Sequence, residues 1–283
     1  MLTKNIRFRN FIIKSNTLTS KKEFKKLLSS NNEILNSLSL KYKYSFSKEI
    51  IKKYKKFTKL RIIGMGGSIL GTEAIYTFLK HKIKKTFFFV NNLKTNITKH
   101  KEKKILNLIV SKSGNTLETI SNSNIFIDKN DKNIFITERK DSYLRNFANS
   151  LKAEIIDHNN FIGGRYSVLS EVGMLPIELG GLNPRKFKQL NFLVKNKNFI
   201  NALVNNEKKN IFLKKKKKYT SVILNYDEKS ENLFKWYQQL LAESLGKKAK
   251  GILPVISSMP KDNHSLMQLY LDGPKKNFYT FFY

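Results

Sequence analysis

The chain has 283 residues, of which 40% are hydrophobic, and a formal net charge of +33 at pH 7. That length allows two domains that each bury a core. The absence of cysteine excludes disulfide frameworks and thiolate metal sites. No two of the four histidines have metal-ligand spacing on one helix face, so we expect neither a metal nor a cofactor; they are His81, His100, His158 and His264.

Lysine supplies nearly all of the positive charge. A basic chain suggests binding to nucleic acid or to an anionic membrane. However, arginine, which contacts phosphate and guanine bidentately, is sparse, and the lysines are scattered except for the run from Lys214 to Lys218. We interpret the charge as a compositional bias at permissive surface positions and expect no specific nucleic-acid partner.

No apolar run has the length of a secretory signal or of a membrane-spanning helix. Phe11-Ile12-Ile13 is short and is bracketed by Arg9 and Lys14, and the densest apolar cluster is Phe87 to Val90. We expect a cytoplasmic protein that makes no membrane contact.

The first 55 residues are predicted to be helical and to pack on the outside of the main domain. Ser20-Lys21-Lys22-Glu23 has the capping-box pattern of a helix start. Apolar residues then recur near helical spacing, at Phe24, Leu27, Leu28, Ile34, Leu35 and Leu38.

From Leu60 the pattern changes to short apolar runs that alternate with helical stretches. The runs are Arg61 to Ile63, Thr86 to Val90, Ile105 to Val110, Ile134 to Ile136 and Ala153 to Ile156. This alternation predicts an α/β fold with a parallel sheet that is covered on both faces. Functional loops are then expected at the carboxyl ends of the strands.

A glycine-rich turn, Gly64 to Thr72, follows the first predicted strand. It is not a dinucleotide fingerprint, because Ile69 stands where the third glycine belongs, and it lacks the Gly-Lys-Ser/Thr ending of a P-loop. Its glycines either allow a ligand to approach the backbone, with Ser68 near a helix start, or serve only a tight turn. The residues alone leave both readings open.

The stretch from Asn107 to Thr119 predicts a strand, a polar loop and a helix N-terminus. Such a helix start directs free N–H groups at the loop, where the hydroxyls of Ser111, Ser113 and Thr116 would converge on a phosphate. An ordinary turn between a strand and a helix is the alternative.

Arg165 lies between the diglycine Gly163-Gly164 and a hydroxyl-rich segment. This setting suits a buried guanidinium directed at an oxyanion, and a surface arginine is the alternative. Leu182-Asn183-Pro184 then interrupts the pattern, and a helical connection leads to a further strand at Tyr219 to Leu224.

The C-terminal region carries a predicted helix from Asn232 to Leu245 that ends at Gly246. Gln239 and Glu243 are four residues apart and share one face of it. By default Glu243 is a solvated carboxylate. A strand at Ile252 to Ile256 precedes a second helix, and the lone His264 beside that helix start is by default structural.

Five segments together resemble, in order and spacing, the motifs of the glucose-6-phosphate isomerase family. They are Gly64 to Gly71, Ser111 to Thr119, Gly163 to Ser167, Gln239 to Lys247 and Asp262 to Gln268. The resemblance implies two sugar-isomerase domains of flavodoxin-like, three-layer parallel-sheet topology, in a cytoplasmic homodimer that works without a metal. The segments implied are a helical region over 1–55, a first domain over 56–180, a helical linker over 181–215 and a partial second domain over 216–283.

The resemblance also implies an activity and the residues that carry it. The family interconverts glucose 6-phosphate and fructose 6-phosphate in glycolysis and gluconeogenesis, through an enediolate. Glu243 matches its base, Arg165 its enediolate stabiliser, and His264 the ring-opening histidine that reaches the site from the other subunit. The positions that match its substrate and phosphate contacts are Gly67, Ser68, Ser111, Lys112, Ser113, Thr116, Gly164 and Gln239.

Two departures from the family pattern are conservative, and a third is not. Asn115 stands where threonine is frequent, and Asn263 where glutamine is frequent. The chain ends in the apolar run Phe278 to Tyr283, whereas the family continues to a helix whose lysine takes part in ring opening. We therefore expect a C-terminally truncated member with normal phosphate recognition and impaired ring opening. A non-catalytic phosphosugar-binding regulatory module is the alternative function.

Overall fold

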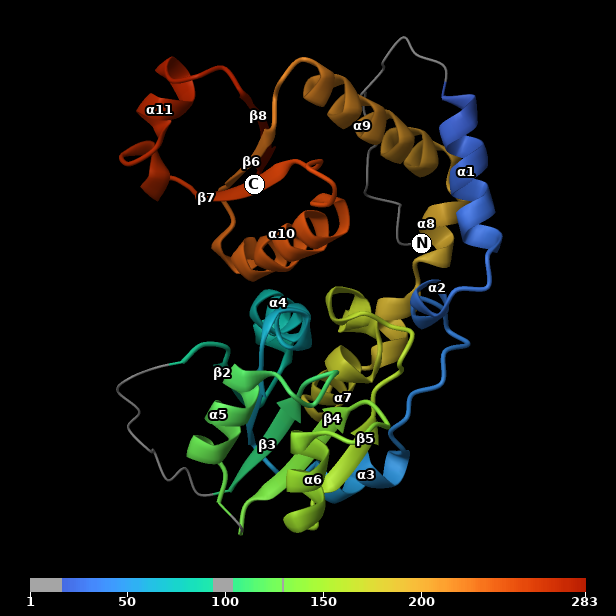
Figure 1. The fold of residues 1–283 in the computed structure, drawn as a ribbon, viewed down its shortest axis with the longest axis vertical. Coiled ribbons are helices and arrows are strands. Elements are labelled where there is room, and N and C mark those ends of the chain that lie inside the picture. The colour runs from blue at the N-terminus through green and yellow to red at the C-terminus, as the bar shows by residue number, and fades with distance from the viewer. Residues whose placement is uncertain (1–16, 94–103, 129) are drawn as a thin grey trace. The chain divides into compact units, whose positions relative to one another are not determined.

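The computed structural model describes residues 17–93, 104–128 and 130–283 (Figure 1). They form two compact units. The five-stranded unit consists of Tyr42–Pro184 with Asn232–Gln239, and the three-stranded unit consists of the described residues up to Lys41 with Arg185–Glu231 and Leu240–Tyr283. The boundaries that the sequence suggests, near residues 55, 180 and 215, remain predictions.

The five-stranded unit is built on a parallel sheet with the strand order β2-β1-β3-β4-β5. The strands are β1 (Lys59–Gly64), β2 (Thr86–Val90), β3 (Ile105–Val110), β4 (Lys132–Thr137) and β5 (Glu154–Asp157). All five predicted strands are present, and every pairing is parallel. The predicted α/β class is therefore confirmed, and the strand order is the flavodoxin-like one.

Helices cover both faces of this sheet. They are α3 (Lys48–Tyr54), α4 (Leu70–Leu79), α5 (Leu117–Phe126), α6 (Tyr143–Ser150) and α7 (Glu171–Leu179), with 3₁₀ turns η1 (Gly66–Ser68), η2 (Lys80–Lys82) and η3 (Gly164–Leu169). Ile63, Ile109 and Phe135 lie in register on one face, where residues of α5 and α6 bury them (Figure 1). Successive side chains of a strand point to opposite faces, and Leu60, Ile62, Leu106 and Leu108 are buried on the other face.

One row of buried polar side chains crosses the same sheet. Arg61 on β1, Asn107 on β3 and Asn133 on β4 stand in register. A guanidinium N–H of Arg61 donates to Asn107 Oδ1 at 3.2 Å, and the Asn107 amide donates to Asn133 Oδ1 at 2.8 Å. The row is tolerated inside the sheet because its members bond to one another.

The three-stranded unit has a second parallel sheet, in the order β7-β6-β8. Its strands are β6 (Thr220–Asn225), β7 (Leu253–Ser258) and β8 (Asn277–Phe282). Val222, Leu224 and Met259 form its buried cluster. The remaining elements are α1 (Leu18–Ser29), α2 (Glu33–Ser37), α8 (Asn191–Lys195), α9 (Lys197–Lys215), α10 (Glu231–Leu245) and α11 (Met267–Asp272), with 3₁₀ turns η4 (Pro184–Lys188), η5 (Glu228–Ser230) and η6 (Lys261–Asn263).

The capping box predicted at Ser20 is wrong. Helix α1 begins earlier, at Leu18, and its first backbone bond runs from Lys21 N to Thr17 O at 3.0 Å. Ser20 therefore lies inside the helix and cannot cap it. A side-chain cap forms instead at α2, where Asn32 Oδ1 accepts from Ile34 N at 2.8 Å.

The sequence analysis expected neither a secretory signal nor a membrane-spanning helix, and the two expectations concern different parts of the chain. The short apolar run Phe11-Ile12-Ile13 lies outside the described residues. Within the described ranges, no helix combines the length and the apolar character that a membrane crossing requires.

Leu108 and Leu117 provide a matched test of the sheet core. Leu108 on β3 is fully buried, whereas Leu117 at the start of α5 is 72% exposed. We expect Leu108→Ala to lower the free energy of unfolding by about 2–5 kcal/mol, because it removes buried methyl groups and leaves a cavity. Leu117→Ala should change it by less than about 0.5 kcal/mol. Urea unfolding measures both, and equal effects would contradict the assigned core.

Candidate active site

The strand order of the five-stranded unit reverses between β1 and β3. In open α/β sheets, ligands bind beside the carboxyl ends of the strands at such a reversal, because the loops on its two sides lead to helices on opposite faces. Gly64 and Val110, the last residues of β1 and β3, pair directly. The glycine-rich turn after β1 and the polar loop after β3 are therefore neighbours at this edge. The sequence predicted both as functional loops at the carboxyl ends of strands.

The polar loop after β3 brings two predicted hydroxyls together. Ser111 is buried, and its Oγ lies 2.9 Å from Thr116 Oγ1. Ser113 is exposed, and its Oγ accepts from Asn115 N at 3.2 Å. Helix α5 begins directly after Thr116, whose side chain makes no capping bond. The first N–H groups of a helix lack intrahelical partners, so the loop has the features of an anion site.

Gly114 and Asn115 hold this loop against the start of α6. Gly114 has φ +66°, and a Cβ there would lie 2.6 Å from Ser142 Cβ. Only glycine satisfies both demands. Asn115 Oδ1 accepts from Tyr143 N at 2.9 Å, so the residue that departs from the family pattern supplies an acceptor for the first N–H of α6.

The Lys112 side chain is already engaged by the protein. Its Nζ donates to Asn160 O at 2.7 Å and lies 3.2 Å from Glu138 Oε1. Sequence reasoning gave Lys112 a phosphate contact without specifying the atom. Its ammonium group bonds to the loop after β5, whereas its backbone belongs to the loop after β3.

The glycine-rich turn after β1 touches the segment that carries Arg165. An ideal Cβ on Gly67 would overlap the carbonyl group of Gly164 and would lie 2.5 Å from Arg165 N. Ser167 Oγ donates to Gly164 O at 2.7 Å and to Gly67 O at 3.3 Å. The two backbones are thus in direct contact, which explains the need for glycine at position 67.

Helix α10 contributes two side chains to the same cluster within the five-stranded unit. The indole N–H of Trp236 donates to Arg165 O at 3.3 Å. Gln239 packs over Gly66, where an added Cβ would lie 2.8 Å from Gln239 Nε2. The Arg165 guanidinium is half-buried and sits 4.6 Å from the centroid of the Tyr166 ring. Predicted residues from three distant segments therefore meet.

Glu243 and His264 belong to the three-stranded unit. Glu243 is exposed and follows Gln239 by one turn of α10, which ends at Gly246 as predicted. His264 is exposed at the end of η6.

Asp262 shapes the turn that presents His264. Its carboxylate accepts from Ser257 Oγ and Ser258 N, each at 2.8 Å, and from Ser265 Oγ at 3.0 Å. These bonds, that from Ser257 first, lower the pKa of Asp262 below its ordinary value. The aspartate of this motif therefore ties the turn to the end of β7.

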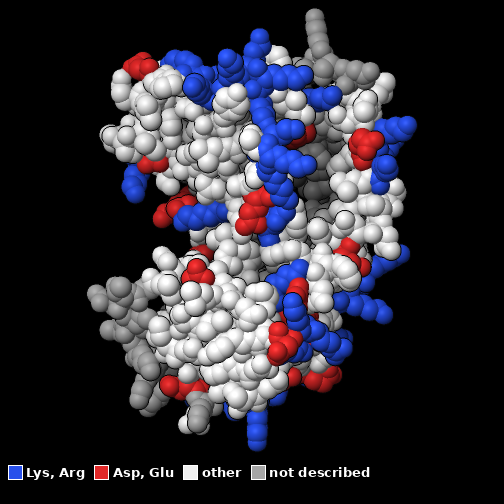
Figure 2. Space-filling model, in the orientation of Figure 1, with Lys and Arg blue, Asp and Glu red and all other residues white. Residues whose placement is uncertain are grey.

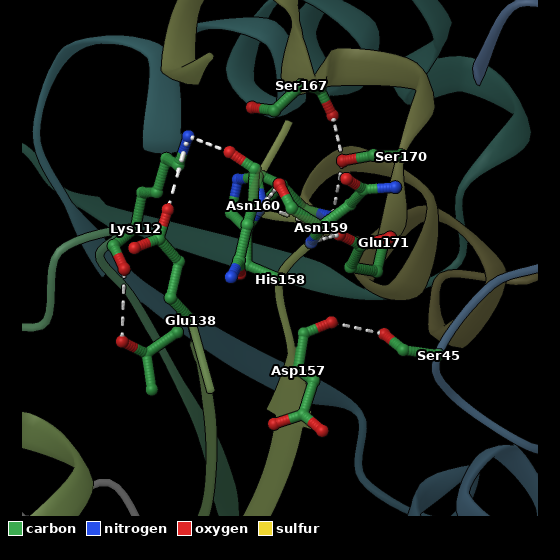
Figure 3. A network of polar contacts seen from close by, with 12 residues as sticks. Ser45, Lys112, Glu138, Asp157, His158, Asn159, Asn160, Ser167, Ser170 and Glu171 are labelled. Atoms are coloured by element: carbon green, nitrogen blue, oxygen red, sulfur yellow. Dashed lines mark hydrogen bonds and ion pairs between the residues drawn. The ribbon is translucent and has the colours of Figure 1, made fainter. Parts of the chain in front are cut away.

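A buried polar network lies behind the loop after β5 (Figure 3). His158 Nδ1 donates to Asn159 O at 2.9 Å and lies 3.6 Å from Glu171 Oε1. Glu171 accepts from Asn159 N and from the Tyr42 hydroxyl, each at 2.8 Å. Burial lowers the pKa of His158 below its ordinary value, which favours the neutral ring.

No metal-ligand cluster marks the part of the chain that the structure describes. Within it, no group of three or more His, Cys, Asp or Glu side chains is placed to hold a metal ion, and His100 lies outside it. Figure 2 shows Lys and Arg spread over the visible face of both units, with Asp and Glu among them.

Comparison with known proteins identifies the family. A family model of phosphoglucose isomerase matches residues 45–255. The chain belongs to the phosphoglucose isomerase family. Glucose-6-phosphate isomerase from Methanocaldococcus jannaschii is 35% identical over 253 residues, which cover 82% of this chain and 62% of that protein. Across four such relatives, the chain spans 57–62% of their length.

Solved structures share the fold of this phosphoglucose isomerase family member. A hypothetical protein from Thermus thermophilus superposes with a TM-score of 0.72 at 21% identity, over 94% of this chain and 69% of that one. Tagatose-6-phosphate ketose/aldose isomerase from Escherichia coli gives 0.56 at 14% identity, over 94% and 68%. The chain thus has the sugar-isomerase type of α/β fold.

Sequence reasoning missed two contacts of this site. One is Glu138, which follows β4 at the same sheet edge as the predicted loops. Its position directly after a predicted strand could have marked it as a residue of the site. Trp236 is the second, and the available signal was that an indole N–H requires a partner when it is partly buried.

The contact between Gly67 and Gly164 gives an asymmetric test. We expect Gly67→Ala to lower the free energy of unfolding by about 1–3 kcal/mol, because its Cβ would overlap the Gly164 carbonyl. Gly164→Ala should change it by about 0.5 kcal/mol or less, since the nearest atom to its Cβ is 4.0 Å away. Urea unfolding of both variants distinguishes them, and equal tolerance would refute the backbone contact.

His158 should make stability depend on pH. Its folded pKa is lowered by burial, so the unfolded chain binds the extra proton first as pH falls below about 6.5. The free energy of unfolding should therefore decrease with falling pH, by at most about 1.4 kcal/mol per pH unit from this residue. The free energy of unfolding of His158→Asn should decrease less between pH 7.5 and 5.5, as measured by urea unfolding. Identical slopes in the wild type and His158→Asn would contradict the assignment.

Proposed function

We propose that this protein is an aldose-ketose isomerase that interconverts glucose 6-phosphate and fructose 6-phosphate. The observation that carries the proposal is the meeting of Gly67, Gly164 and Arg165 beside the polar loop after β3, at the reversal of strand order. Membership of the phosphoglucose isomerase family supports it. The substrate and the activity are proposed for this chain, which spans only part of its relatives.

The polar loop after β3 would hold the phosphate of the substrate. Ser111 and Thr116 would offer hydroxyls, and the N–H groups at the start of α5 would face the anion. Lys112 would contribute its backbone N–H, since Glu138 and Asn160 engage its ammonium group. Ser113 and Ser68 would complete the contacts, with Gly67 and Gly164 allowing close approach.

The reaction requires one base and one positive group near the sugar carbonyl. Glu243 would take the proton from C2 of open-chain glucose 6-phosphate while the C1 carbonyl oxygen takes up the electron pair. Arg165 would stabilise the enediolate charge. The C2 hydroxyl proton would pass to O1, and the proton held by Glu243 would return to C1 as the C2 carbonyl forms. Gln239, one turn before Glu243, would contact the substrate, and His264 would help to open the sugar ring.

The homodimer and the cytoplasmic location are proposals of the same kind. In the proposed dimer, His264 would reach the site from the other subunit. Participation in glycolysis and gluconeogenesis would follow from the proposed reaction. No metal, cofactor, specific nucleic acid or membrane is part of the proposal.

A non-catalytic phosphosugar-binding module is the second candidate. The polar loop after β3 and the glycine contact would suffice for such binding. Turnover of fructose 6-phosphate by the purified chain separates the two, because a sensor would bind it without converting it.

Replacement of the proposed base tests the mechanism directly. Glu243→Gln should lower kcat by about 10²–10⁴-fold, because an amide cannot accept the proton. Fructose 6-phosphate should still bind in calorimetry, since the phosphate contacts lie on another loop. Glu231→Gln, at the opposite end of the same helix, should keep the wild-type kcat. A folded Glu243→Gln variant with full turnover would exclude Glu243 as the base.

A further inference from the structure

The Lys112 side chain spans three neighbouring strand ends. Lys112 follows β3, Glu138 follows β4, and Asn160 follows β5, in strands that lie side by side (Figure 3). The ammonium group bonds to Asn160 O at 2.7 Å and pairs with Glu138 Oε1 at 3.2 Å. Two of its three N–H donors are thus directed at protein acceptors. These contacts join the proposed phosphate loop to the loop after β5.

The loop after β5 leads directly to Arg165. Asn159 N bonds to Glu171 Oε1 at 2.8 Å, and Ile162 is fully buried. The next two residues, Gly163 and Gly164, have no side chains that could fix the backbone. The position of Arg165 therefore depends on the contact of Gly164 with Gly67 and on what anchors the chain before and after this diglycine.

The contacts that hold the chain before the diglycine come from a different loop than those that hold it after. After the diglycine, Ser167 and Trp236 bond to the backbone of Gly164 and Arg165. Before it, the Lys112 ammonium holds Asn160 O, and this is the contact that comes from the proposed phosphate loop. Lys112 is thus a side chain through which the phosphate loop can act on the guanidinium.

We propose that Lys112 is a positioning residue, whose ammonium group holds the loop after β5 so that Arg165 stays aligned with the reacting carbons. This rests on the proposed function. In that reaction Arg165 acts on charge that develops in the transition state, whereas the phosphate is bound equally in the ground state and in the transition state. Loss of the Lys112 contact should therefore lower kcat and leave phosphate affinity in place.

Kinetics of Lys112→Met tests this assignment. We expect kcat to fall about tenfold from misplacement of Arg165, with KM within about twofold of wild type. Affinity for inorganic phosphate, measured by calorimetry, should also stay within about twofold. Lys112→Arg keeps a cation that can reach both acceptors and should restore kcat to within about threefold of wild type. Lys140→Met removes an exposed lysine that also follows β4, at the carboxyl edge of the sheet. It should leave kcat, KM and the affinity for phosphate unchanged.

Glu138→Gln tests the same link from its other end. The glutamine amide weakens the ion pair without changing a residue of the phosphate loop, so kcat should fall and KM should stay near the wild-type value. Because both changes break one connection, Lys112→Met/Glu138→Gln should be no slower than Lys112→Met alone. Should Lys112→Met fail to fold, Glu138→Gln and Lys112→Arg still carry the test.

The single tryptophan of the chain offers a readout that needs no turnover. Trp236 donates to Arg165 O at 3.3 Å, so its fluorescence reports on the segment that Lys112 is proposed to hold. Lys112→Met should shift the emission to longer wavelength as this bond loosens. Lys112→Arg and Lys140→Met should keep the wild-type spectrum.

Two results would overturn the proposal. Lys112→Met with an unchanged kcat and markedly weaker inorganic phosphate binding would make the ammonium a phosphate ligand. Lys112→Met with wild-type kinetics and emission would show that the contact has no role. If the wild type binds fructose 6-phosphate without converting it, the proposed function fails, whereas the emission of Trp236 still decides whether Lys112 holds the Arg165 segment.

Discussion

The backbone contact between Gly67 and Gly164 is the constraint on which the candidate site depends. It joins the turn after β1 to η3, and Ser167 Oγ reinforces it by donating to Gly67 O across 100 positions of sequence. Two further glycines pack closely against η3, because Cβ atoms on Gly71 and Gly173 would overlap Val168. The segment that carries Arg165 is therefore seated by backbone shape.

Local pattern was enough to predict the strands and the loops that follow them. Apolar runs that are bounded by turns and alternate with helical stretches predict parallel strands. Parallel strands bring their carboxyl ends to one edge of the sheet, so the sequence could place Ser111 and Gly67 at that edge. Partners distant in sequence could not be predicted. Lys112 finds Asn160, and Trp236 finds Arg165, only after the chain has folded. The capping box at Ser20 failed because α1 could start earlier, at Leu18.

Acidic residues are scarce in this chain, and three of those in the five-stranded unit make specific contacts near the loop after β5. The chain has 21 acidic residues against 54 lysines and arginines, so cationic side chains outnumber carboxylates. Glu138 and Glu171 nevertheless lie within the network around the loop after β5, and Asp157 pairs with Arg145 at 2.8 Å. Partly buried pairs are screened less by salt than exposed ones, so these contacts persist in a chain whose surface charges repel one another.

The polar row Arg61-Asn107-Asn133 has a consequence for how the sheet assembles. Apolar side chains on both faces would tolerate sliding of one strand along its neighbour, because one isoleucine or leucine replaces another. A slip by one residue would instead separate Arg61 from Asn107 and Asn107 from Asn133, so that both buried hydrogen bonds of the row would be lost. The row therefore admits one alignment of β1, β3 and β4. By fixing that alignment, it also fixes which residues emerge at the carboxyl edge where the glycine-rich turn and the polar loop begin.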